Sequence, residues 1–127
     1  EWGCLHRGGT IIRNDSAMNI SGDAYEEFVM PRDQKILAAV GGGVHFCGKG
    51  DHYVSHLAEI RGLSCINMSE PARNNMETIY RNTVDRGILI FGMRSSEVER
   101  AAAAGRELHG LVHKGASVAA WVSEKEK

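Results

Sequence analysis

The sequence lacks the features that mark several specialised classes of protein. It has no apolar run of the roughly 18 residues that a membrane-spanning helix needs, and its first residues do not form a secretory signal peptide. With 15 basic and 16 acidic residues it has no basic stripe, so nucleic acid and anionic membranes are not expected partners. Its three cysteines are odd in number and have no disulfide-framework spacing, which predicts a reducing, cytoplasmic setting.

What the chain does contain suffices for one folded domain over residues 1–127. Hydrophobic residues make up 43% of the 127 residues, so a core can form, and the polar end at 123–127 is expected to fray. Apolar runs typical of strands occur at 10–13, 44–47, 63–68 and 88–91. Helical spacing occurs at 25–40, 51–61, 74–87 and 96–113, with a kink or restart expected at Pro31.

Strands and helices therefore alternate as four βα units, which predicts an α/β fold with a parallel sheet. Capping boxes at Asn74–Glu77 and Ser96–Glu99 are expected to begin the last two helices. Four such units fit a small doubly wound domain, which stands alone. They also fit half of an eight-stranded barrel, which leaves two open sheet edges. The spacing alone is compatible with both arrangements.

The most distinctive stretch is the run GGGVHFCGKG at residues 41–50. His45 and Cys47 lie two residues apart on an expected strand, so both side chains point to the same face. An imidazole and a thiolate side by side at a strand end can hold zinc or line an active site. The alternative is a buried cysteine and a hydrogen-bonded histidine in a core strand. Cys65, on the next strand, is the nearest candidate for a third ligand or else a small core residue.

Three stretches together resemble the uroporphyrinogen decarboxylase superfamily, which also holds the cobalamin- and corrinoid-dependent methyltransferases. They are GTIIRNDS at 9–16, the segment from Ser21 to Pro31 that contains YEEFVMP, and VHFCG at 44–48. They occur in the family's order, and the resemblance covers roughly residues 8–113. It implies the C-terminal half of a TIM barrel. The chain would then be a fragment, a split subunit, or a protein that completes a barrel with a second copy.

The resemblance also implies chemistry at the mouth of the barrel, either decarboxylation or methyl-group transfer. In the methyltransferases the zinc ligands are His-x-Cys and a second cysteine near the C-terminus, whereas this chain has no cysteine after Cys65. Zinc on His45 and Cys47 is therefore the implied cofactor, with the third ligand missing. The acidic and arginine residues important to the decarboxylases belong to the half of the barrel that has no counterpart here.

Other polar residues at expected strand ends are candidates for the same cleft. Asp15 and Ser16 match an Asp-Ser pair at the family's substrate cleft, and they are equally typical of a cap or an Asx-turn. Asn67, Ser69 and Glu70 lie at the end of the third strand, where Asn67 is expected to bind substrate and Glu70 to act as a general acid or base. A solvated loop carboxylate is the alternative for Glu70.

Two further candidates lie near the Gly-rich turn. Lys49 is expected to meet an anionic substrate group there, and the turn itself is not a P-loop. His52 and His56, like His109 and His113, are spaced i, i+4 on expected helices and could grip a metal. We expect His52 to line the substrate pocket, and we expect His56, His109 and His113 to lie on solvated helix faces.

The resemblance to the uroporphyrinogen decarboxylases implies an enzyme that acts on a small molecule. Its partner is a second copy in a homo-oligomer or the missing half-barrel. The alternative, from a different class, is a catalytically silent domain whose open sheet edges make it self-associate. A stable monomer would favour the closed doubly wound domain instead.

Overall fold

Five strands pair into one parallel sheet in the order in which they follow one another along the chain. The computed structural model describes residues 9–115, and within them the sheet order is β1-β2-β3-β4-β5. The strands are β1 (Thr10–Arg13), β2 (Gly42–Phe46), β3 (Leu63–Met68), β4 (Leu89–Met93) and β5 (Val112–Lys114). The predicted α/β class and parallel pairing are confirmed. The tail expected to fray at residues 123–127 lies outside the described residues.

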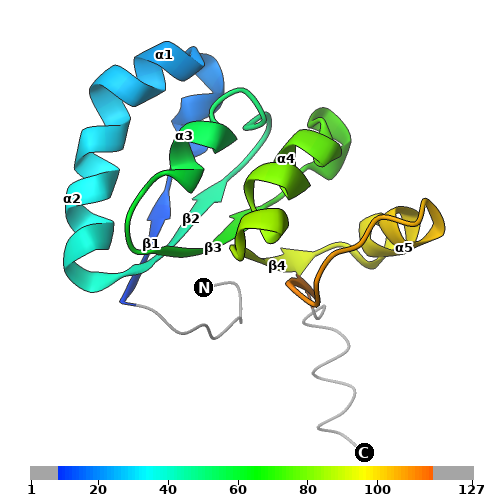
Figure 1. Cartoon of the computed structure of the whole chain (residues 1–127). Coiled ribbons are helices and arrows are strands. Elements are labelled where there is room, and N and C mark those ends of the chain that lie inside the picture. The colour runs from blue at the N-terminus through cyan, green and yellow to red at the C-terminus, as the bar shows by residue number, and fades with distance from the viewer. Residues whose placement is uncertain (1–8, 116–127) are drawn as a thin grey trace, which may run out of the picture.

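The strand order separates this sheet from a doubly wound one. A doubly wound sheet reverses its strand order at a switch point, whereas here each strand pairs with the next along the chain. Right-handed crossovers between such strands return on the same face. Figure 1 shows α3 and α4 above the strands, and α2 alongside β1. The sheet is therefore wound in one direction, with its helical layer on one face.

The helices are short, and some of them continue into a 3-10 or a π-helical turn. They are α1 (Gly22–Ala24), α2 (Met30–Val40), α3 (Val54–Ala58), α4 (Met76–Asn82) and α5 (Ser95–Ala103), with a π-helical turn η2 (Tyr25–Val29) and 3-10 turns η1 (Asp15–Asn19), η3 (Pro71–Arg73) and η4 (Val84–Arg86). Pro31 lies in the first turn of α2, directly after the π-helical turn η2, and the helical segment continues without a break from Gly22 to Val40. Of the kink or restart expected at Pro31, the restart does not occur, and the hydrogen-bond spacing of the helix instead changes from π to α.

Both predicted capping boxes are wrong, the first by one residue and the second by two. The cap of α4 is Asn75, whose side chain accepts a hydrogen bond from the Thr78 N–H at 3.1 Å. Asn74 is unavailable as a cap because its side chain bonds the loops that follow β2 and β3. Helix α5 begins at Ser95, so Ser96 lies inside it, and the residue before it, Arg94, makes no side-chain cap.

The helix predicted over residues 96–113 is too long, and a fifth strand takes its second half. Helix α5 ends at Ala103, and Gly105 follows with a φ of 71°, a left-handed conformation that stops a helix. The Ile90 N–H then donates to the Leu111 carbonyl at 2.8 Å, which draws the chain alongside β4. The four βα units expected from the pattern are therefore followed by β5.

The core lies between the sheet and the helices. Val44 and Phe46 of β2 are fully buried in it, together with Leu37 of α2 and Leu57 of α3. Because side chains alternate along a strand, His45 points to the opposite face of the sheet. His45 is buried, with only 2% of its surface exposed, but it therefore lies outside the apolar core.

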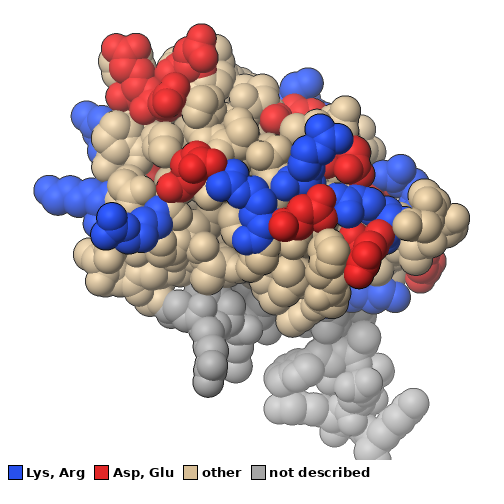
Figure 2. Space-filling model, viewed as in Figure 1, with Lys and Arg blue, Asp and Glu red and all other residues tan. Residues whose placement is uncertain are grey.

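Charges of both signs mix over the viewed face of the molecule. Figure 2 shows Lys and Arg interspersed with Asp and Glu over the helical layer, with red atoms gathered near α1. Arg106 joins two helical turns by pairing with Glu77 at 2.9 Å and with Asp85 at 2.7 Å. Within residues 9–115, no helix has the length and apolar character needed to cross a membrane.

Candidate metal centre at the carboxyl ends of β1 and β2

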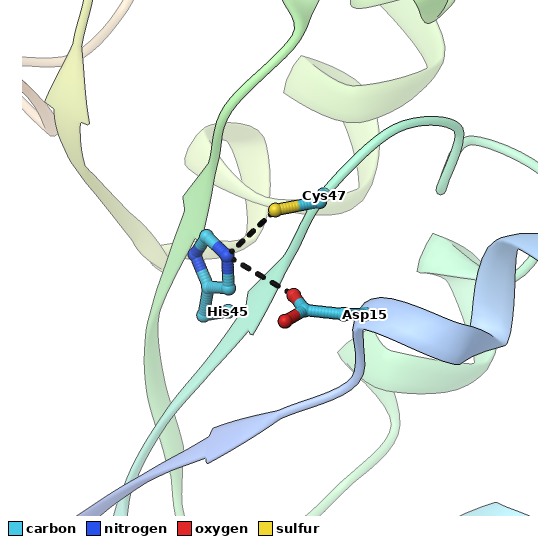
Figure 3. A group of neighbouring side chains, drawn as sticks. All are labelled: Asp15, His45 and Cys47. Carbon is cyan, nitrogen blue, oxygen red and sulfur yellow. Dashed lines mark hydrogen bonds and ion pairs between the residues drawn. The ribbon is translucent and has the colours of Figure 1, made fainter.

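Three side chains of different chemistry converge at one edge of the sheet. Asp15, His45 and Cys47 each offer one ligand atom, and these atoms all lie within 4.8 Å of one another. Figure 3 shows the three side chains facing one another, His45 from β2 and the others from the turns after β1 and β2. The register pairs Arg13 with His45, so the chain leaving β1 passes directly beside the end of β2. Carboxylate, imidazole and thiolate are the three donor types that zinc binds.

His45 is the buried centre of the group. Its Nε2 lies 3.2 Å from the Cys47 Sγ and 3.2 Å from the Asp15 Oδ1. Its Nδ1 lies 2.6 Å from the Oδ1 of Asn67 on β3. One ring nitrogen is thus held by the sheet, and the other faces the side chains of Asp15 and Cys47.

Cys47 lies one residue beyond β2, not within the strand as predicted. Its thiol is partly exposed and lies 3.3 Å from the Ser69 hydroxyl, which follows β3. The turns after the parallel strands β2 and β3 therefore place a thiol and a hydroxyl side by side at the carboxyl edge of the sheet. A metal-bound thiolate would accept the Ser69 O–H as a donor.

One carboxylate oxygen of Asp15 is buried and accepts no hydrogen bond among the described residues. This oxygen is Oδ1, and the His45 ring nitrogen is near it. The other oxygen, Oδ2, lies 3.3 Å from the Arg13 guanidinium. A buried carboxylate oxygen without a donor is costly, and a cation bound between the three residues would satisfy it.

A buried polar network fixes the turn that carries Asp15. The Asn14 N–H donates to the His45 carbonyl at 2.8 Å, and the Asn14 side chain donates to Asp33 at 2.7 Å. Asp33, itself 5% exposed, also accepts from the Tyr25 hydroxyl at 2.7 Å. Burial, followed by that bond to Asp33, raises the pKa of Tyr25 well above its usual range. Tyr25 therefore stays a donor, and the end of β1 is tied to β2 and α2.

An open cleft of about 510 Å³ adjoins the group on the β1 side. It is lined by Arg13, Asn14, Asp15, Ser16, Ala17, Ile20 and Val29. Asp15 and Ser16 also begin the η1 turn, in which no side-chain cap forms. Their place in a substrate cleft remains a prediction. The cleft offers a cation at Arg13 and apolar surface at Ile20 and Val29.

The remaining predicted site residues lie around the group without being among its three donors. Glu70 is ion-paired with Arg73 at 3.4 Å, and Lys49 is ion-paired with Asp51 at 3.6 Å. His52 bonds the Ile20 carbonyl through Nε2 at 2.9 Å, which places it behind the cleft wall. Catalytic or substrate-binding roles for these residues remain predictions.

The two histidine pairs expected on helices do not form. His52 lies in the turn before α3, whereas His56 is within it and faces Glu26 at 3.9 Å. His109 lies in the loop after α5 with a φ of 54°, and His113 belongs to β5. Without one continuous helix the i, i+4 geometry is absent, so the expectation of shared helix faces is wrong.

Asp15 as a third donor beside His45 and Cys47 was not anticipated from the sequence, and neither was the Asn67 bond. The signal was available, because residues that follow neighbouring parallel strands meet at the same sheet edge. Comparison with family models, with curated proteins and with solved structures finds no match to this chain. The case for function therefore depends on the geometry described above.

Proposed function

We propose that the chain is part of a βα-barrel enzyme of the uroporphyrinogen decarboxylase type, with a zinc ion bound by Asp15, His45 and Cys47. The single observation that carries the proposal is the convergence of these three donors within 4.8 Å at the carboxyl edge of a sequentially ordered parallel sheet. In barrel enzymes this edge holds the active site. The buried, unsatisfied Oδ1 of Asp15 supports a cation there.

Of the two reactions that the resemblance implies, the donor set favours transfer of a methyl group to a thiol. Zinc with three protein ligands keeps one position open, and there it lowers the pKa of a bound thiol or water. Cys47 and Asp15 supply negative charge, and neutral His45 supplies a lone pair. Ile20 and Val29 give the adjoining cleft an apolar wall for a methyl-bearing substrate.

Decarboxylation is the other reaction, and one feature of the cleft suits it. Arg13 borders the cleft beside Asp15 and is 55% exposed, so it can face a substrate carboxylate. Activity that survives loss of the metal ligands would favour this reaction over methyl transfer.

Metal analysis of the purified chain tests the proposal. We expect about one zinc per chain, and a tenfold or greater loss of zinc affinity in each of Cys47→Ser, His45→Gln and Asp15→Asn. Cobalt-substituted protein should show a sulfur-to-cobalt charge-transfer band that only Cys47→Ser abolishes. Cys65→Ser is the matched control, because Cys65 is buried on β3 and is not among the three donors. A wild-type chain that binds neither ion refutes the metal centre.

A second candidate function is self-association, which a specific surface favours. Phe28, Ile36 and Val40 of η2 and α2 are 60%, 45% and 54% exposed. They belong to the helical segment that lies beside β1 in Figure 1, and within the described residues β1 pairs only with β2. A second copy could add its β5 edge in parallel to β1, and two such junctions would close a ring.

Molar mass in solution tests this second candidate. We expect a dimer that Ile36→Lys dissociates, because a charge on the apolar surface opposes burial. Lys35→Glu, an exposed change on the same helix, should leave the dimer intact. A wild-type chain that stays monomeric at high concentration excludes self-association through these edges.

A further inference from the structure

Asn67 joins three neighbouring strands at the level of His45. It lies on β3 and is the register partner of His45 on β2. Its Oδ1 lies 2.6 Å from the His45 Nδ1, and its Nδ2 donates to the Phe91 carbonyl of β4 at 2.6 Å. Both ends of the amide are thus engaged by the sheet.

The Phe91 carbonyl decides how the Asn67 amide is oriented. A carbonyl only accepts hydrogen bonds, so the group that faces it must be the NH₂ of Asn67. The amide oxygen then faces His45, and an oxygen acceptor requires that Nδ1 of His45 carries the proton. Asn67 therefore selects one of the two neutral forms of the imidazole.

The next strand is shaped to receive this amide. Gly92 follows Phe91 with a φ of 71°, a conformation that favours glycine. A Cβ at this position would lie 2.6 Å from the Asn67 Nδ2. Any side chain at position 92 would therefore push the amide away from the carbonyl that orients it.

We infer that Asn67 is a positioning residue that keeps His45 in the Nδ1–H tautomer and so presents its Nε2 lone pair to Asp15 and Cys47. A neutral imidazole has one N–H, and the hydrogen bond at one nitrogen determines the state of the other. The lone pair then lies where a metal would accept it without a tautomer change. Its consequence for metal affinity rests on the metal centre proposed above, whereas the tautomer itself does not.

The tautomer is measured directly in metal-free protein by ¹⁵N NMR of the imidazole nitrogens at a pH where His45 is neutral. The His45→Gln variant assigns the signals. We expect the Nδ1–H pattern in the wild type and in Asn67→Asp, whose carboxylate still accepts from Nδ1–H. In Asn67→Leu we expect the Nε2–H pattern or a mixture. An Nε2–H pattern in the wild type overturns the inference whether or not zinc binds.

Zinc affinity measured against a competing chelator gives the second readout. Removing the outer partner of a ligating histidine typically costs about 10- to 100-fold in affinity, which is the loss we expect for Asn67→Leu. Asn82→Leu is the matched control, since its amide bonds the Thr78 carbonyl on α4, away from the site. Should Asn67→Leu fail to fold, the wild-type tautomer still tests the inference, because an Nε2–H pattern there overturns it. Equal zinc affinity in folded Asn67→Leu and wild type overturns the role, whereas no zinc binding in the wild type refutes the metal centre alone.

Discussion

Two cysteines of the described chain experience opposite environments. Cys47 is partly exposed beside an imidazole and a hydroxyl. Cys65 is 3% exposed on β3, and burial raises the pKa of its thiol even though a bond to Ser64 lowers it in part. The same residue type is thus accessible at one site and inert at the other, and sequence position alone does not distinguish the two.

This contrast predicts the pattern of alkylation in the native protein. At mildly alkaline pH we expect iodoacetamide to modify Cys47 and to spare Cys65, because a buried thiol with a raised pKa offers little thiolate. Added zinc should slow modification of Cys47 tenfold or more. Peptide mass mapping identifies the modified residue. Modification of Cys65 before Cys47 would contradict the burial that the structure gives it.

At the scale of elements, a single asparagine holds two loops together. The Asn74 side chain accepts from the N–H groups of Gly50 and Asp51 at 2.8 and 3.1 Å, and donates to the carbonyls of Gly48 and Glu70 at 2.9 Å each. These loops follow β2 and β3 and carry Cys47 and Ser69 toward each other. The loops beside the candidate metal centre are therefore anchored by a residue that makes no contact with it.

The neighbouring asparagines should differ in their effect on stability. Asn75→Ala removes an ordinary N-cap and should lower the free energy of unfolding by about 1 kcal/mol. Asn74→Ala leaves four loop groups without their partner and should cost about 2–3 kcal/mol. Urea denaturation of both variants measures the difference. A larger loss in Asn75→Ala than in Asn74→Ala would contradict the role of Asn74 as the anchor of the two loops.

Much of the element pattern could be predicted because strands and their order follow from local periodicity. Residues 63–68 form β3 with the predicted bounds, and the irregularity expected near Pro31 takes the form of the π-helical turn that precedes α2. The boundary after α5 could not be predicted from the alanine-rich run. It depends on Gly105 and on the contact of Arg106 with Asp85 and Glu77, which brings together residues far apart in sequence.

The candidate site was predictable only in part, for the same reason. The shared face of His45 and Cys47 follows from their spacing, because alternation along an extended chain is local. The approach of Asp15 depends on the pairing of β1 with β2, and the position of Asn67 depends on the pairing of β3 with both β2 and β4. The sequence places these residues at strand ends, but it does not give the register, which decides which of them contact His45.

At the scale of the whole molecule, all three tyrosines of the chain are buried. Burial is the largest cause that raises the pKa of Tyr25, Tyr53 and Tyr80, and nearby carboxylates add to it. An unfolded tyrosine ionises near about pH 10. Since the folded pKa values are raised, the stability from these groups is fully present below that pH and is lost as the pH rises above it.

The folded protein should therefore show no independent tyrosine titration. In an alkaline titration we expect the tyrosinate absorbance to rise together with the loss of the circular dichroism signal, in one cooperative transition above about pH 10. Tyrosinate formed while the dichroism stays native would contradict the burial of these side chains.

Tyr53 offers the sharpest variant for this experiment, because its fully buried hydroxyl has no hydrogen-bond partner among the described residues. Tyr53→Phe removes both an ionisable group and a buried, unsatisfied one. We expect it to move the alkaline transition to higher pH and to raise the free energy of unfolding at neutral pH by about 1 kcal/mol. Tyr80→Phe is the matched comparison, since the Tyr80 hydroxyl donates to Glu97 at 2.9 Å and its loss leaves that buried carboxylate with one donor fewer. Tyr80→Phe should therefore destabilise at neutral pH, and equal effects of the two variants would show that the Tyr53 hydroxyl has a partner in solution.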